Sequence, residues 1–489
     1  MAENDSSSLT KYFADDPPSL FDELVQPQQL SIIQNSDPPM KFPDVTHLLN
    51  EEVTKPNVPN EVIDFWEPSP YLSATSTSSV PPPLTLPGMY TSVDYQDYIK
   101  EVSTALLGKI EAVAKRSDIL SENDVTQDDR GLRQLILSGC FSAALNLTSR
   151  LLSVYGQGFN NVGQVSKSTP HSLGLWFTRL SLLLRLGQYD ICVKEAEPFG
   201  KLNNPDMYFE NYPELYPGRK GSLASFSFRL LLAELPIYKS RLNEAMNNLT
   251  ELLETCKKIK TYFERTNSDA GRFWQRRIFR VMHSIINCAI MKKDHALATE
   301  LLQQILRETD DEDEKKSLEL ALGRVFLQSG DIKSAEICFT RVFGEKRDTV
   351  TLLECINRGL VHVAKAEFGE ALKYFTKGLE LDDKNIMLHN NLAVCLLYTG
   401  QLKNAIRQFE TAIELNPHQA LNENLLLNLS TLYELESNDA RTKKLALLRK
   451  VATYKPDLNC SVEVCLKLEY KRQTDDFVIK MEKKDTYVV

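Results

Sequence analysis

The clearest alternation of hydrophobic and polar positions in the chain lies between residues 385 and 417. Leucines at helical spacing form one apolar face over residues 388–397, and a second apolar face follows around Phe409. Gly400 separates the two faces and suits the position after a helix end, because glycine tolerates positive φ. The pattern predicts two amphipathic helices joined by a tight turn, with Pro417 closing the second helix.

The spacing of small and aromatic residues in this hairpin resembles the tetratricopeptide repeat. Small residues would let the two helices approach closely, while a phenylalanine fills the space between them. The residues that carry the pattern are Asn391, Leu392, Ala393, Gly400, Ala405, Phe409, Ala412 and Pro417. His389 and Leu396 stand where the repeat usually has tryptophan and tyrosine, so this copy is degenerate.

Two earlier segments repeat the pattern in phase. One step of 34 residues back from Ala405 reaches Ala371, and a further step of 36 residues reaches Ala335. The corresponding small and aromatic pairs are Gly359 with Phe375 and Gly323 with Phe339. One helical hairpin cannot bury its own apolar face, so stacked copies are expected. The sequence therefore predicts an all-α solenoid over residues 93–470, with its clearest repeats at 318–417.

Residues 1–92 differ in composition from the rest of the chain. Before Thr91 there are 13 acidic residues, three lysines and 14 of the 22 prolines. Such a segment has too little apolar material for a core, so we expect an acidic, Pro/Ser-rich disordered region. Its apolar islands at 20–25 and 62–66 have the form of linear motifs that fold onto a partner, or are residual hydrophobicity in a linker. Within the second island, Trp66 is the residue to test. At the other end of the chain, we expect residues 471–489 to form a charged tail.

Charge and cysteine usage exclude several functional classes. The net charge is −9, and because residues before Thr91 carry −10, the rest of the chain is nearly neutral at about +1, which does not suggest a nucleic-acid-binding protein. Nine scattered cysteines form no CxxC pair or metal-ligand spacing, so we expect no metal and reduced thiols. No signal-peptide pattern and no apolar run of about 18 residues occurs, which predicts an intracellular protein without a transmembrane segment.

No catalytic constellation is found, so we expect a protein that is not an enzyme and needs no cofactor. GxSxG, HExxH, P-loop and kinase signatures are absent, and the seven histidines are dispersed. The alternatives are a protein-binding scaffold, a repeat co-chaperone, or a repeat domain attached to an unrecognised enzyme. A co-chaperone needs a clamp of lysine, asparagine and arginine. Asn391 matches one clamp position, but Ile356, Leu360 and Asn428 stand where other clamp residues are needed.

Four arginines, Arg272, Arg276, Arg277 and Arg280, gather on one predicted helix. They suit contact with nucleic acid or lipid, or a solvated face that pairs with acidic neighbours or a partner protein. We favour the second interpretation, and take Arg276 and Arg277 as candidates for partner contact, together with Asn391.

A tyrosine- and proline-rich insertion over residues 203–222 interrupts the helical pattern. Its YPELYPGRKGS stretch (212–222), followed by FSFRLLLAELP (226–236), resembles the family of subunit 12 of the trafficking protein particle (TRAPP) complex, also called tetratricopeptide repeat protein 15. The resemblance covers roughly residues 95–470. Tyr212, Tyr216 and Arg219 are the candidate contact residues of the insertion, which is either packed on its own hairpins or presented to a partner.

The resemblance implies a function that the repeats alone do not. The chain would be a non-catalytic scaffold subunit of the TRAPP III vesicle-tethering complex, whose core is a nucleotide-exchange factor for a Rab GTPase. It would contact other TRAPP subunits, and the GTPase only indirectly. The implied processes are endoplasmic reticulum-to-Golgi transport and autophagy, with a cytoplasmic location peripheral to Golgi and intermediate membranes. The resemblance also implies a second role at kinetochores in mitosis.

Overall fold

The computed structural model describes residues 59–69, 83–91 and 94–470, apart from 165, 167, 266–267, 345–349, 437–438 and 459. Over these residues the chain is helical, with two isolated β-bridges and no β-strand, which confirms the predicted all-α class. The first α-helices are α4 (Asn60–Ile63), α5 (Tyr98–Leu107), α6 (Lys109–Lys115), α7 (Asp129–Leu137), α8 (Phe141–Val154), α9 (Pro170–Arg185), α10 (Tyr189–Ala196), α11 (Phe226–Glu234), α12 (Leu242–Glu264) and α13 (Ser268–Met291). The later ones are α14 (His295–Glu308), α15 (Glu312–Ser329), α16 (Ile332–Phe343), α17 (Leu352–Ala364), α18 (Phe368–Leu381), α19 (Ile386–Tyr398), α20 (Leu402–Leu415), α21 (Pro417–Ala420), α22 (Glu423–Glu436), α23 (Ala440–Tyr454) and α24 (Val462–Cys465).

Helices α15 to α20 are the three predicted repeat hairpins. Gly359 of α17 lies so close to Phe375 of α18 that a Cβ atom on the glycine would be 2.3 Å from Cε1 of the ring. Gly323 and Phe339 make the same contact in the preceding hairpin, at 2.4 Å. The small and aromatic positions of the repeat therefore set the distance between paired helices, as the sequence predicts.

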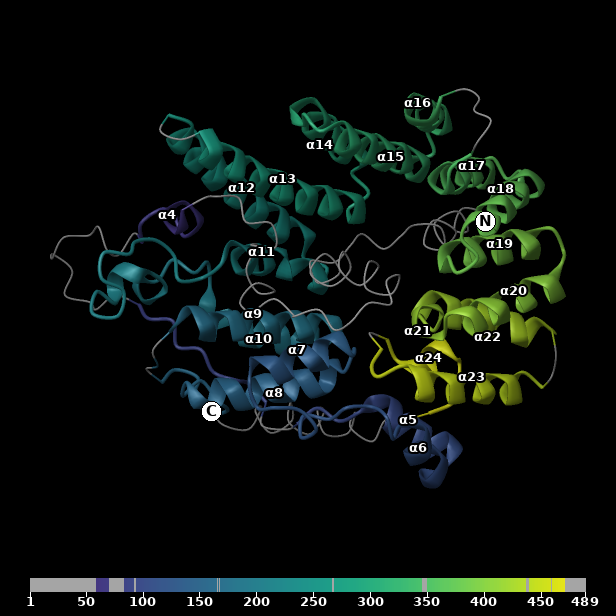
Figure 1. Ribbon diagram of the computed structural model, residues 1–489, viewed down its shortest axis with the longest axis horizontal. Coiled ribbons are helices and arrows are strands. Elements are labelled where there is room, and N and C mark those ends of the chain that lie inside the picture. The colour runs from purple at the N-terminus through teal and green to yellow at the C-terminus, as the bar shows by residue number, and fades with distance from the viewer. Residues whose placement is uncertain are drawn as a thin grey trace, which may run out of the picture.

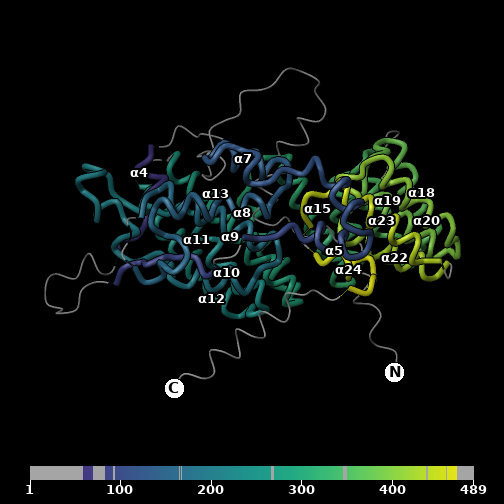
Figure 2. Tube along the Cα trace, turned by 90° about the horizontal axis from the view of Figure 1, so that it is seen from below, coloured from purple at the N-terminus to yellow at the C-terminus, as the bar shows by residue number. Residues whose placement is uncertain are grey.

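The two ends of the solenoid meet. Helices α5 and α6, next to the N-terminal end of the body, pack against α23 and α24 at its C-terminal end (Figure 1), and the view from below shows the same neighbours (Figure 2). Ile99 and Val102 of α5 are buried in one hydrophobic cluster with Leu448 and Val451 of α23. The two ends cover each other because both present an apolar helix face.

We call the contact of α5 and α6 with α23 and α24 the closing joint. Arg116, just after α6, stabilises it with hydrogen bonds and an ion pair. Its buried guanidinium donates to the carbonyls of Ala452, Lys455 and Pro456 at 3.3, 2.9 and 2.6 Å, and forms an ion pair with Asp97. The last carbonyls of a helix have no partner within the helix and carry partial negative charge. The Arg116 side chain, from the N-terminal end of the body, therefore supplies hydrogen-bond donors to carbonyl groups at the C-terminal end of α23.

Candidate protein-interaction site

Residues 203–222, the predicted insertion, form a loop whose base is packed and whose tip is exposed. The base contains two 3₁₀ turns, η2 (Pro205–Met207) and η3 (Phe209–Asn211). Met207 and Phe209 are buried, and N of Phe209 donates to O of Gly221 at 3.0 Å, which closes the loop. Residues 213–215 and 217–220 are exposed. The base of the insertion is thus packed on the body, while its exposed tip leaves presentation to a partner as a prediction.

The three candidate contact residues of the insertion surround Phe209. Tyr212 and Tyr216 are half-buried, and burial raises the pKa of the Tyr212 hydroxyl. The ring of Tyr216 meets Phe209 edge-on with centroids 5.0 Å apart, and the guanidinium of Arg219 lies 4.0 Å from the centre of the same ring. Only Arg219 of the three is exposed, so it is the one that remains accessible to other chains.

Residues 59–69, which we call the docked segment, pack against the insertion and helices α11 to α13. Val62 is buried, Phe65 stacks on Tyr262 at 5.4 Å, and Trp66 lies 6.3 Å from Trp274, measured between ring centroids. Disorder was expected over the whole range 1–92, and the structure differs at this stretch because its apolar side chains fill a space between two hydrophobic clusters. The other apolar island, at 20–25, lies outside the described residues.

The body holds the docked segment by its backbone as well as by its side chains. Gly221 allows the approach, because a Cβ atom at that residue would lie 2.3 Å from O of Asp64. Three carbonyls of the segment accept hydrogen bonds from the body. The pairs are Ser222 N to Asp64 O (2.8 Å), Arg277 Nη1 to Ile63 O (3.1 Å) and Tyr208 Oη to Glu67 O (2.9 Å). The GRKGS part of the insertion is thus a receptor loop for residues of the N-terminal region.

The predicted arginine cluster on α13 divides into buried and exposed members. Arg277 is 5% exposed, and its guanidinium lies 4.5 to 4.8 Å from the ring centres of Phe226, Phe273 and Trp274. Arg276 is exposed. Arg277 therefore builds the wall behind the docked segment, whereas Arg276 is accessible to a partner.

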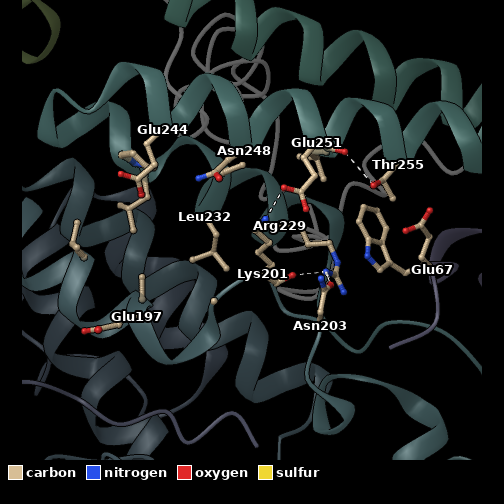
Figure 3. Close-up of a pocket in the computed structure, with 18 of the residues that line it drawn as sticks. Glu67, Glu197, Lys201, Asn203, Arg229, Leu232, Glu244, Asn248, Glu251 and Thr255 are labelled. Carbon is tan, nitrogen blue, oxygen red and sulfur yellow. Dashed lines mark hydrogen bonds and ion pairs between the residues drawn. The ribbon is translucent and has the colours of Figure 1, made fainter. Parts of the chain in front are cut away.

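A cleft of about 760 Å³ opens beside Trp66 and continues between α10, α11 and α12. Arg229 of α11 lies on its floor and is 5% exposed, beside Lys201 and Asn203 in Figure 3. Its guanidinium donates to O of Lys201 (2.8 Å), O of Leu202 (3.0 Å), Oδ1 of Asn203 (3.3 Å) and Oγ of Ser222 (2.9 Å).

Arg229 is a buried cation whose hydrogen-bond partners are all neutral. Among the described residues no carboxylate pairs with it and its Nε has no partner, while the indole of Trp66 lies 4.4 Å from the guanidinium. Burial lowers the pKa of Arg229 to about 10, so it remains charged at neutral pH. Sequence reasoning missed this residue, although a lone arginine within the apolar run 226–236 is a usable signal because a buried charge needs a partner.

Asn391 is fully buried on α19 and does not form part of a carboxylate clamp. Its Oδ1 accepts from Nδ2 of Asn390 at 3.3 Å, and Oδ1 of Asn390 accepts from Asn428 at 3.0 Å. The Nδ2 of Asn391 has no partner among the described residues. Ile356 and Leu360, which stand at other clamp positions, are buried as well. The clamp positions Ile356, Leu360, Asn391 and Asn428 carry no basic side chain, so the co-chaperone alternative gains no support.

A second polar group missed by sequence reasoning joins α7, α8 and α9. Nδ1 of His171 lies 2.7 Å from the hydroxyl of Tyr155, and its Nε2 lies 2.8 Å from Asp129. The hydrogen bond that the imidazole donates to the Asp129 carboxylate raises the pKa of His171. In the described part of the chain, no group of three or more His, Cys, Asp or Glu side chains could hold a metal ion. No helix within it is long and apolar enough to cross a membrane.

Comparison with known proteins agrees with this architecture. The tetratricopeptide repeat family matches residues 387–419, the last of the three hairpins. A crystal structure of a tetratricopeptide repeat protein from Parabacteroides merdae aligns with 61% of this chain and 98% of that chain, at 13% identity and a TM-score of 0.34. Because a TM-score of 0.34 is too low to support the fold by itself, the fold assignment depends on the repeat match at residues 387–419 and on the helix packing.

Two curated relatives carry the same name, trafficking protein particle complex subunit 12. The human protein is 38% identical over 387 residues, and the mouse protein is 37% identical over 392 residues; each alignment covers 76% of this chain. The chain spans about half the length of these relatives, 52% of the human and 49% of the mouse protein. The resemblance to subunit 12 of the trafficking protein particle complex is therefore confirmed over three quarters of this chain.

Proposed function

We propose that the chain is a non-catalytic scaffold subunit of TRAPP III, acting in endoplasmic reticulum-to-Golgi transport and autophagy through protein–protein contacts. The observation that carries the proposal is the 38% identity to human trafficking protein particle complex subunit 12 over 387 residues. A stack of helical hairpins, as seen here, suits a scaffold because it presents long continuous surfaces to partners.

The proposal places the chain among other TRAPP subunits, with a Rab GTPase contacted only indirectly. It also gives a cytoplasmic location peripheral to Golgi and intermediate membranes. No nucleic-acid contact is proposed, since Arg277 of the α13 cluster is buried and Arg272 pairs with Asp269. The mitotic role at kinetochores that the family resemblance implies stays a prediction.

Affinity purification of the tagged chain tests the proposal. Proteins that stay bound through size-exclusion chromatography are identified by mass spectrometry. Co-elution at high mass with a fixed set of TRAPP subunits is the expected result. Elution of the chain alone, or with chaperones only, would contradict the scaffold proposal. Catalysis by the chain itself would be indicated if the purified chain alone accelerated nucleotide exchange on a Rab GTPase.

A further inference from the structure

The docked segment is held in the manner of a bound peptide. Within it, only Asn60–Ile63 form a helical turn, and its contacts reach residues 140 or more positions away, such as Tyr208. Carbonyl groups accept hydrogen bonds from the body, while Val62, Phe65 and Trp66 fill separate apolar positions. Peptide-recognition modules use the same two features: main-chain hydrogen bonds give affinity, and pockets for particular side chains give specificity.

The charges of the segment and of the surface beneath it are complementary. Residues 59–69 contain three acidic side chains and no basic one. Arg219 donates to Oδ2 of Asp64 from Nε at 2.9 Å and from Nη2 at 2.5 Å. Nζ of Lys258 lies 3.8 Å from Oε1 of Glu67. Arg229 lies beneath Trp66, and Arg277 lies beside Ile63. The surface therefore selects an acidic ligand.

The docked segment leaves part of the site empty. Trp66, Glu67 and Pro68 line only one end of the 760 Å³ cleft, whose remaining walls come from α10, α11 and α12. Of the carboxylates that line the cleft, Glu251 pairs with Lys201 at 2.5 Å and Glu244 with Arg241 at 3.0 Å, and Glu197 also lies in the lining. No carboxylate of the described residues pairs with Arg229 on the floor. A longer acidic peptide could fill the cleft and supply the carboxylate that Arg229 lacks.

We propose that this surface is a peptide-binding site, with the docked segment as its tethered occupant in the free chain. An acidic, tryptophan-containing peptide of a partner protein replaces that segment. The site consists of the residues of the insertion that contact the docked segment, together with four residues of the helices. They are Tyr208, Arg219, Gly221, Ser222, Arg229, Lys258, Trp274 and Arg277. The partner peptide places an aspartate at Arg219, an aromatic pair at the positions of Phe65 and Trp66, and continues into the cleft. This inference deepens the proposed scaffold function by giving the chemistry of one partner contact.

Peptide binding to the purified full-length chain tests the recognition. The probe is a fluorescein-labelled peptide with the sequence of residues 58–70, followed by fluorescence anisotropy. In the wild-type chain the tethered segment competes at an effective concentration in the millimolar range. A Phe65→Ala/Trp66→Ala chain, which weakens the tethered occupant, is expected to bind the probe at least about tenfold more tightly. Equal weak binding to both chains would overturn the proposal.

A charge exchange makes the test independent of whether the double variant folds. The single variant Arg219→Glu weakens the tethered segment and the probe alike, because both carry Asp64. A probe carrying Asp64→Arg should bind this variant more tightly than the original probe does, since the exchange re-forms the ion pair with reversed sign. Lys220→Glu, on an exposed neighbour outside the contacts that define the site, is the matched control and should show no preference for the exchanged probe. Equal binding of the two probes to Arg219→Glu would overturn the assignment of the site.

Replacement by a partner is tested in the assembly recovered with the tagged chain. Hydrogen exchange over residues 59–69 should be faster in the assembly than in the free chain, since the partner peptide displaces the segment. Unchanged protection would show that the segment stays in place, which overturns the replacement. A concentration-dependent dimer of the purified chain would instead identify a second copy as the source of the peptide. If no assembly is recovered the scaffold proposal fails, while the probe measurements still decide whether the site exists.

Discussion

The carboxylate of Asp457 caps helix α8 from 315 residues further along the chain, where it accepts from N and Oγ of Ser142 at 2.8 and 2.9 Å. Ser142 lies in the first turn of α8, whose backbone N–H groups have no partner within the helix. The closing joint therefore supplies a helix cap as well as an apolar contact. This arrangement ties the stability of α8 to the contact between the two ends of the body.

Asp457 should make the stability of the closing joint depend on pH. Burial raises its pKa to about 6, so the free energy of unfolding falls as the pH rises through that value and the carboxyl ionises. Asp457→Asn keeps an oxygen acceptor for Ser142 but cannot ionise. We expect this variant to be more stable than wild type by roughly 1–3 kcal/mol above pH 7, with the difference vanishing near pH 4. Thermal unfolding from pH 4 to 8 measures it.

Asp118→Asn, on an exposed residue after α6, is the control for removing one negative charge. Its unfolding curves should follow those of the wild type. Parallel pH profiles for Asp457→Asn and wild type would show that the carboxyl does not carry this dependence.

The contact between Gly359 and Phe375 should tolerate no added methyl group. Gly359→Ala forces the ring of Phe375 or the helix pair to move, and we expect it to lower the free energy of unfolding by about 1–3 kcal/mol. Denaturant unfolding measures this loss. Gly369→Ala on α18 is the matched control, because no atom lies within 4 Å of its added Cβ. Addition of Phe375→Leu to Gly359→Ala should recover part of the loss, and strict additivity would contradict the contact.

The neighbouring arginines of α13 should respond differently to charge reversal. Arg277→Glu places a carboxylate against three aromatic rings and removes a donor from O of Ile63, so we expect a loss of at least about 2 kcal/mol in unfolding free energy. Arg276→Glu changes an exposed side chain and should stay within about 0.5 kcal/mol of wild type. Circular dichroism melting measures both. Loss of co-purifying subunits with Arg276→Glu, at unchanged stability, would support the predicted partner contact.

His171 should stabilise the contact between α7 and α9 mainly at low pH. Asp129 raises its pKa above that of an unfolded histidine, so the stabilisation is complete below about pH 6.5 and disappears as the pH rises through the folded pKa. His171→Gln should therefore lower the melting temperature at pH 6 and leave it unchanged at pH 9. A titration of the imidazole by NMR in Asp129→Asn should show a lower pKa than in wild type. An unaltered titration would rule out Asp129 as the cause.

The repeat hairpins could be predicted from the amino-acid sequence because their determinants are local. Helical periodicity, a glycine at the turn and a small residue opposite a phenylalanine all fall within one repeat of about 34 residues. Gly359 and Phe375 thus lie where their spacing predicts. The irregular insertion and its tyrosines were also visible as a break in the helical pattern. The family resemblance came from the insertion as well, since the repeats alone fit many families.

The closing joint, the docked segment and the burial of individual polar residues depend on contacts between residues far apart in the chain. Arg116 and Pro456 are neighbours only after the solenoid has curved back on itself, and Asp64 meets Arg219 only when the docked segment lies on the insertion. Periodicity likewise assigns Arg276 and Arg277 to one charged helix, although only packing against α11 and the docked segment buries the second. Local spacing determines the helices of this protein, because a helix depends on residues three and four apart. Which surfaces remain exposed depends on how those helices stack.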